Sequence, residues 1–216
     1  MVDASRFVES LFGGPAREPG NRAAFTYYLP RPIPRGLDLS PDVVAGLSDA
    51  DAALGLLQGL GILIRDPSLL IGPYLRREAL ASSRIEGTQA SLSDVLQAEI
   101  DDESRTDDTG EVERYLEATA QAYELAKTLP ITQRLVLQVH ATLLRGVRGE
   151  EKSPGEFRRT PVWVGHTGAT PDTAVFVPPL PAHLPELMQD WEVFVNDEGR
   201  ALPPLIQAAL MHYQFE

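Results

Sequence analysis

The sequence predicts a mainly α-helical fold that carries one short β-hairpin. Apolar residues recur at helical spacing over most of residues 41–145 and again over 184–215. Short β-prone runs, VWV and VFV, stand out only in the region of about 160–178, where glycine and proline lie between them. With 216 residues and 43% apolar residues, the chain is long and apolar enough to bury a sizeable core.

Composition excludes several classes of function. A net charge of −12 argues against binding to duplex nucleic acid or to an anionic membrane surface, because both need a basic surface. The absence of cysteine excludes disulfides, thiolate metal sites and cysteine nucleophiles. The first residues lack the basic start and apolar run of a signal peptide, and no stretch is read as a membrane span. We therefore expect a cytoplasmic protein without nucleic-acid or membrane partners.

Residues 1–40 are expected to form an extended, proline-rich N-terminal arm. The run LPRPIP at 29–34 contains three prolines, each of which fixes its own φ angle and biases the preceding residue away from helix. The arm also carries aromatic and apolar side chains. This content predicts that it lies over a surface of the protein.

Residues 41–110 are expected to form a helical region. Ser40 before Pro41 is a typical helix start, and a second helix is predicted at about 73–86. Ser91 and Asp94 have the spacing of a capping box, which predicts a helix over 92–100. The stretch 101–113 is rich in Asp and Glu and is interpreted as a solvated loop and an internal boundary.

Residues 111–216 continue this pattern. Helices are predicted at about 111–128 and 132–145, and a hairpin is predicted at about 160–178. Two further helices follow, and the last one shows no stop signal before the final residue.

Residue chemistry alone reveals no catalytic or metal site. The histidines are scattered, and common nucleophile and phosphate-loop motifs are missing. Only His212 and Glu216 pair at helical spacing, and two side chains do not complete a metal site. We therefore predict no catalytic residue and no metal ligand within the chain.

Glu86 is the unusual residue of the predicted helix at 73–86. A carboxylate in the last turn faces the negative end of the helix dipole, which costs about 0.3–1 kcal/mol unless a cation offsets it. Ser82, four residues earlier, can share its face and donate a hydrogen bond. On residue chemistry alone, a solvated glutamate beside the glycine cap Gly87 is the simpler interpretation.

A longer string of residues around Glu86 favours a functional interpretation instead. The string RREALASSRIEGTQ at 76–89 resembles the inhibitory-helix signature of Fic (Fido) proteins, (S/T)xxxE(G/N), in the group that carries this helix N-terminal to the catalytic core. Three more segments resemble the family in the same order: YLPRPIP at 28–34, PGEFR at 154–158 with VWVG at 162–165, and PPLIQAALMHYQFE at 203–216. The resemblance implies a Fic-type helical bundle with a β-hairpin flap. Residues 41–110 then hold the inhibitory helix, and 111–216 form the N-terminal part of the Fic core.

The resemblance implies a protein adenylyltransferase, which moves AMP from ATP to a Ser, Thr or Tyr hydroxyl of a target protein. ATP and Mg²⁺ are the implied cofactors. Ser82, Glu86 and Gly87 are the implied inhibitory residues, with Glu86 near the site of the ATP γ-phosphate. The implied target-docking flap consists of Val162, Trp163, Val164 and Gly165.

The family's catalytic motif, HPFx(D/E)GNGRxxR, does not occur in these 216 residues. By resemblance it follows Glu216, so we expect the chain to stop just before it and to be inactive alone. Two alternatives stay open: a non-catalytic helical module that binds proteins, and a Fic variant that removes AMP or transfers another phosphate-linked group. The sequence specifies neither the target nor the oligomeric state, and a homodimer is compatible with it.

Overall fold

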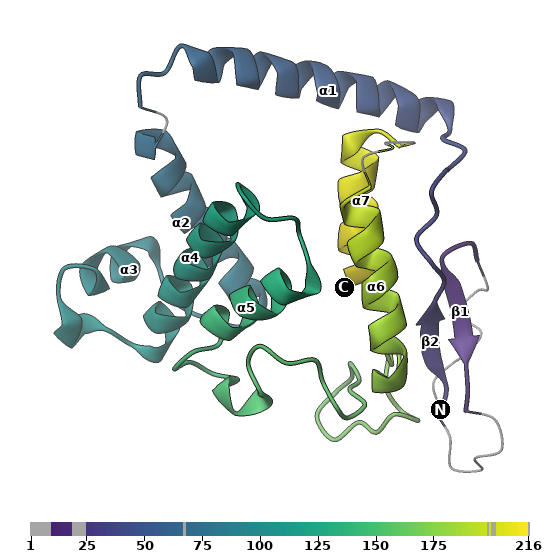
Figure 1. Cartoon of the computed structure of the whole chain (residues 1–216). Coiled ribbons are helices and arrows are strands. Elements are labelled where there is room, and N and C mark those ends of the chain that lie inside the picture. Colours follow the sequence, from purple (N-terminus) through teal and green to yellow (C-terminus); the bar gives the residue numbers. More distant parts are fainter. Residues whose placement is uncertain (1–9, 19–24, 67, 198, 200–201, 216) are drawn as a thin grey trace. The chain divides into compact units, whose positions relative to one another are not determined.

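The structure is a computed structural model that describes residues 10–18, 25–66, 68–197, 199 and 202–215. Figure 1 shows the elements in chain order. They are β1 (Gly13–Ala16), β2 (Tyr27–Pro30), α1 (Pro41–Ile62), α2 (Ser68–Ile85), α3 (Leu92–Ala98), α4 (Asp107–Ala126), α5 (Gln133–Leu143), α6 (Leu184–Val195) and α7 (Pro204–Phe215). Short 3₁₀ turns lie at Asp102–Ser104, Glu150–Lys152 and Pro181–His183. The prediction of a mainly helical fold is confirmed.

The chain divides into two compact units, each described separately below. Unit 1 comprises residues 1–38, 131–133 and 157–216, and unit 2 comprises 39–130 and 134–156. The N-terminal arm thus belongs to the same unit as the flap region and the last two helices.

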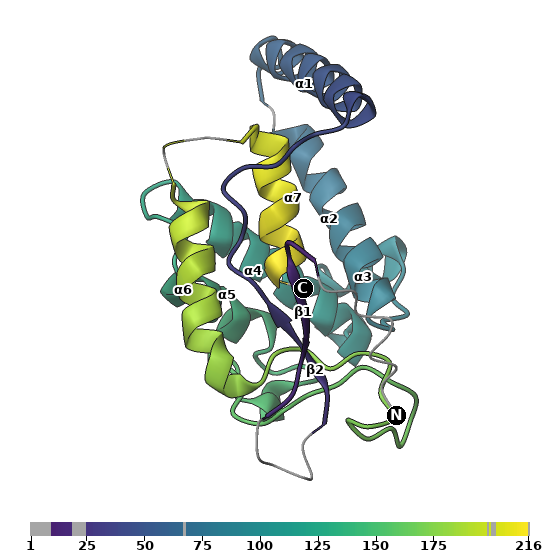
Figure 2. The ribbon, with the colours of Figure 1, turned by 90° about the vertical axis from the view of Figure 1, so that its right-hand side faces the viewer.

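The arm of unit 1 contains a strand pair that the sequence did not predict. β1 and β2 are antiparallel, with Gly13 opposite Pro30 and Ala16 opposite Tyr27, and they run side by side in both Figure 1 and Figure 2. The Tyr28 N–H donates to the Val177 carbonyl at 2.8 Å, which ties β2 to the end of the predicted hairpin. Pairing between the two halves of the arm thus adds a small sheet to unit 1.

Unit 1 has its core under this sheet and between its last two helices. Tyr27, Ala174, Val177 and Leu180 form one buried cluster. The Tyr27 hydroxyl is 2.9 Å from Nε2 of His183, so the buried ring keeps a polar partner. α6 contacts α7, where the indole N–H of Trp191 donates to the Met211 carbonyl at 3.1 Å.

Unit 2 has its core where α2, α3 and α4 meet. α2 lies beside α4 in Figure 1, and α3 contacts both helices. The buried side chains come from all three helices and from the turn between α2 and α3; they are Ala79, Leu80, Ala90, Val95 and Val112. One face of α2 is therefore fixed inside unit 2.

Helix α1 begins where the sequence predicts and then departs from expectation. The Ser40 side chain accepts a hydrogen bond from the Val43 N–H, and Pro41 occupies the first turn. None of the 22 residues of α1 is buried. By length and composition alone the helix could cross a membrane, so the sequence-based exclusion of any such segment was too strict. Such a match is weak support for a membrane span, and the absence of a membrane partner stays a prediction.

Two predicted boundaries are wrong. α2 begins at Ser68, not at about 73, and Pro73 lies inside it. Pro73 has no backbone N–H to donate, so α2 lacks the hydrogen bond to the carbonyl four residues earlier, and the proline ring crowds that turn. The acidic stretch is not a loop throughout, because α4 begins at Asp107.

That early start of α4 has a clear cause. Thr106 and Thr109 cap each other's backbone N–H groups, at 3.2 and 2.9 Å. Asp107 and Asp108 fall in the first turn, where negative charge is favourable to the helix dipole. The capping box of Ser91 and Asp94 that starts α3 was predicted and is confirmed.

Candidate functional site

Glu86 lies directly after the last residue of α2. Its backbone N–H donates to the Ser83 carbonyl at 3.1 Å, and Gly87 continues the chain with φ +98°, a conformation that glycine adopts without strain. The Glu86 side chain is exposed, and with the described residues its carboxylate forms no hydrogen bond or ion pair. The structure therefore presents an unpaired negative charge at a helix end that does not favour it.

Ser82 does not hold Glu86 in this structure, contrary to expectation. Its hydroxyl donates to Oε1 of Glu78 at 3.1 Å, one turn earlier in α2. The reason is geometric: helical side chains tilt toward the N-terminus, so Ser82 leans toward Glu78, and Glu86 has already left the helix.

The small residues beside Glu86 pack inside unit 2. Ala79 and Ser83 are buried, and Thr88, just past the glycine, is only 3% exposed. The Thr88 N–H donates to the Ser83 carbonyl at 3.0 Å, so the chain turns back on the end of α2. The buried flanks fix the backbone on both sides of Glu86 and leave its carboxylate free to meet a cation.

The predicted flap forms a hairpin-like loop with little regular strand. Within described residues 157–180, its ladder is a single antiparallel bridge between Val164 and Phe176. The Val164 N–H donates to the Phe176 carbonyl at 2.8 Å, and the Val164 carbonyl accepts from Val175 at 2.8 Å. Prolines at 161, 171, 178 and 179 withhold backbone donors, which explains why two full strands do not form.

The outer edge of this flap is open. Val162 and Val164 are 43% and 62% exposed, and Trp163 is 41% exposed. The Trp163 indole N–H donates to the Ala169 carbonyl at 2.8 Å, which fixes the ring on the flap's own tip. Gly165 has no room for a side chain, because a Cβ there would lie 2.8 Å from the Cβ of Ala169.

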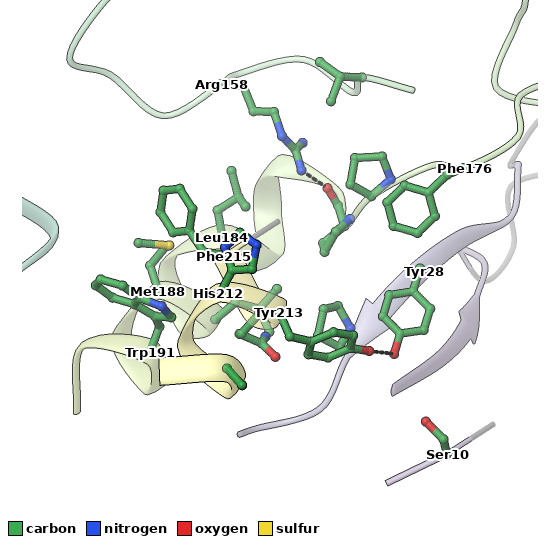
Figure 3. A pocket seen from close by; sticks show the side chains of 17 residues that line it. Ser10, Tyr28, Arg158, Phe176, Leu184, Met188, Trp191, His212, Tyr213 and Phe215 are labelled. Carbon is green, nitrogen blue, oxygen red and sulfur yellow. Dashed lines mark hydrogen bonds between the residues drawn. The ribbon is translucent and has the colours of Figure 1, made fainter. Parts of the chain in front are cut away.

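An apolar groove of about 950 Å³ lies within unit 1, and sequence reasoning did not predict it. Figure 3 shows its side chains, which come from β2, the flap region, α6 and α7. At one wall the Tyr28 and Tyr213 hydroxyls are 2.9 Å apart. Burial and this hydrogen bond raise the pKa of Tyr28 well above its usual value, so the Tyr28 hydroxyl stays protonated at neutral pH.

Arg158 lines the opposite part of this groove (Figure 3). One guanidinium nitrogen donates to the Pro179 carbonyl, and the other, Nη1, is buried without a partner among the described residues. Burial also lowers the pKa of Arg158. The PGEFR string quoted above contains this arginine, but only the fold shows its place in an apolar wall.

The described residues do not assemble a metal centre. Among them, no group of three or more His, Asp or Glu side chains is close enough to hold an ion. His212 lies in the groove, His183 bonds Tyr27, and His140 belongs to unit 2. Glu216, which the sequence placed at helical spacing from His212, lies outside the described residues.

Comparison with known proteins gives these features a context. The family model described as Fic/DOC family N-terminal matches residues 44–124, and the model described as Fic/DOC family matches 130–216. A protein named "Protein adenylyltransferase Fic" from Drosophila grimshawi is 40% identical over 91 residues, which are 42% of this chain and 17% of that protein. Its counterpart from Drosophila virilis is 38% identical over 91 residues, 42% of this chain and 16% of that protein. The chain thus matches about a sixth of the length of these curated relatives.

A solved structure supports the fold. The crystal structure of a Fic family protein from Desulfovibrio desulfuricans G20 superimposes with a TM-score of 0.56 at 22% identity, covering 86% of this chain and 53% of that one. At this identity the likeness speaks for the fold alone. The two family models together match most of the sequence, on either side of residues 125–129. The chain belongs to the Fic/DOC family.

Proposed function

We propose that this chain is the regulatory and flap-bearing part of a protein adenylyltransferase. In the reaction, a Ser, Thr or Tyr hydroxyl of a target protein attacks the α-phosphorus of ATP. A new phosphoester bond forms, the bond to the β-phosphate breaks, and pyrophosphate leaves. The names of the curated relatives support this reaction class.

The observation that carries the proposal is the free carboxylate of Glu86 at the end of α2. We propose that Glu86 pairs with an arginine of the catalytic motif and so withholds that cation from the γ-phosphate of ATP. Two opposite charges about 4 Å apart interact by roughly 1 kcal/mol in water and about 4 kcal/mol near a protein surface. Such a pairing competes effectively with ATP in its productive pose.

ATP and Mg²⁺ are not assigned to residues of this chain. The described residues form no cluster suited to Mg²⁺, and the groove of unit 1 offers one arginine whose guanidinium already donates to the Pro179 carbonyl. A triphosphate needs several donors or cations, so these residues do not fit it. The proposal therefore places nucleotide and metal binding in the HPFx(D/E)GNGRxxR motif, after Glu216.

The flap supports a role in target docking. Because Val164 turns both its N–H and its carbonyl toward Phe176, the backbone groups of Trp163 point to the other side, as alternation in extended chains requires. Among the described residues those groups find no partner. An extended target segment can pair there as an added strand, through main-chain hydrogen bonds that do not depend on its sequence.

The test compares rates of AMP transfer in the full-length polypeptide that carries both this chain and the motif. Glu86→Gly should raise the rate at least about tenfold, because removing about 1.4 kcal/mol of competition changes a rate by that factor. Glu86→Asp keeps the charge but shortens the reach, so it should release the enzyme only in part. An unchanged rate in Glu86→Gly would refute the inhibitory role. Loss of AMP from a pre-modified target instead of its gain would favour the AMP-removing variant.

A further inference from the structure

The end of α2 is held by residues that lie far from it in sequence. Arg148, in the turn after α5, donates from Nη2 to the backbone carbonyl of Glu86 at 3.1 Å. The same nitrogen donates to Oε2 of Glu111 on α4 at 3.2 Å, and Nε of Arg148 lies 3.2 Å from Oε1 of Glu111. One guanidinium thus joins the inhibitory residue's own peptide group to α4.

The Glu111 carboxylate is fixed from a second direction. The Thr88 hydroxyl donates to Oε2 of Glu111 at 2.5 Å. Glu111 is 15% exposed at its side chain, and Thr88 is 3% exposed. Charge-assisted hydrogen bonds in such a sheltered place are stronger than neutral ones. Glu111 therefore anchors both Arg148 and the residue two positions after Glu86.

These contacts determine the direction of the Glu86 side chain. Its N–H is held by Ser83, its carbonyl by Arg148, and Gly87 makes the turn that lets Thr88 reach Glu111. With both peptide groups held, the Cα–Cβ bond of Glu86 points in one direction. The cation of Arg148 also offsets the negative end of the α2 dipole.

We propose that Arg148, Glu111 and Thr88 form a latch that holds Glu86 in its inhibitory position. Arg148 and Glu111 are thereby positioning residues for inhibition, and this inference rests on the proposed function of Glu86. The latch lies entirely within unit 2. The Arg148 side chain is 62% exposed. Truncating it therefore releases the end of α2 without leaving a cavity in the core.

Arg145 offers a matched control. It lies three residues before Arg148, pairs with Glu117 on the same helix α4, and is 57% exposed. Arg145→Ala removes the same charge and one ion pair, and the hydrogen bonds of its guanidinium go to Glu117 and not to the latch.

The test measures AMP transfer in the full-length polypeptide. Arg148→Ala should raise the rate about three- to tenfold, the effect of losing one exposed ion pair and one hydrogen bond to a carbonyl. Arg148→Lys can serve only one of the two acceptors and should fall between wild type and Arg148→Ala. Arg145→Ala should match wild type. In the Glu86→Gly background, Arg148→Ala should add nothing, because no inhibitory carboxylate remains to be held.

A second readout uses the 216-residue chain and needs no activity. Hydrogen exchange at the Thr88 amide should quicken in Arg148→Ala and stay unchanged in Arg145→Ala, while the buried amides of α4 keep their protection in both. General loss of protection would mean that Arg148 merely stabilises unit 2, which would overturn the positioning role.

The two proposals fail in different ways. If Glu86→Gly raises the rate and Arg148→Ala does not, the latch is wrong and the inhibitory role of Glu86 stands. If Arg148→Ala raises the rate equally in the Glu86→Gly background, Arg148 acts by another route and the latch is again wrong. If neither variant raises the rate, both proposals fall.

Discussion

Asp190 clamps the N-terminal arm to α6, and replacing it tests how the arm is held. Its Oδ2 accepts from the Ile33 backbone N–H at 2.7 Å, and its Oδ1 accepts from Nη2 of Arg35 at 2.8 Å. Ile33 is 3% exposed, so Asp190→Ala leaves a buried N–H without an acceptor, which costs about 1–3 kcal/mol. Loss of the partly exposed ion pair adds about 0.2–1 kcal/mol. The guanidinium of Arg35 keeps its place 5.0 Å over the Phe194 ring.

We therefore expect Asp190→Ala to lower the free energy of unfolding of unit 1 by about 1.2–4 kcal/mol. The assay is urea unfolding followed by tryptophan fluorescence, since Trp191 is 6% exposed and lies one residue from the clamp. Asp190→Asn keeps an oxygen that can accept from Ile33 and should lose less than half as much. A loss below about 0.5 kcal/mol in Asp190→Ala would refute the clamp. Equal losses in both variants would place the stabilisation in the charge and not in the Ile33 hydrogen bond.

Three further predictions concern unit 2. Burial lowers the pKa of His140 in the folded state, and its Nδ1 accepts from the Gly155 N–H at 3.0 Å. The stability contributed by neutral His140 should therefore be complete above the unfolded pKa of about 6.5 and should decline as pH falls through the folded pKa. His140→Asn keeps a hydrogen-bond acceptor but cannot be protonated, so it should flatten the plot of melting temperature against pH. An unchanged plot would contradict this prediction. Gly155→Ala should destabilise the protein by about 1–2 kcal/mol in a denaturant titration, because the new Cβ would lie 3.0 Å from the Cβ of Ala141 and the residue has φ +82°. Gly168 has φ +83° but open space around it, so Gly168→Ala should cost only the backbone strain of a positive φ. Thr106→Ala should cost about 1 kcal/mol through loss of the α4 cap, and no shift in the thermal melt followed by circular dichroism would exclude that role.

Local signals predicted the features that depend on neighbouring residues. Ser40 with Pro41 and Ser91 with Asp94 marked two helix starts, because a cap satisfies backbone groups only a few residues away. The start of α4 was missed because its capping box uses Thr109 in place of the usual Glu or Gln. An acidic run was then interpreted as a loop, although negative charge in a first turn favours the helix.

Sequence patterns could not predict the contacts between residues that lie far apart in the chain. β1 has the sequence GGPA, which carries no β-branched residue, and only its pairing with β2 makes it a strand. The latch joins Arg148 to Glu111, 37 positions apart, and the groove brings Arg158 beside α6 and α7. The position of Glu86 was predictable from its motif, whereas Ser82 turned to Glu78 because of the direction in which helical side chains lean.

The central claim is that Glu86 restrains the transfer of AMP. The most direct measurement incubates the full-length Glu86→Gly polypeptide with ATP labelled on the α-phosphate in one reaction and on the γ-phosphate in another. The wild-type polypeptide is treated in parallel. The account predicts protein-bound label from the α-phosphate only, and more of it in Glu86→Gly than in wild type. Protein-bound label from the γ-phosphate, or α-label no greater than in wild type, would contradict it.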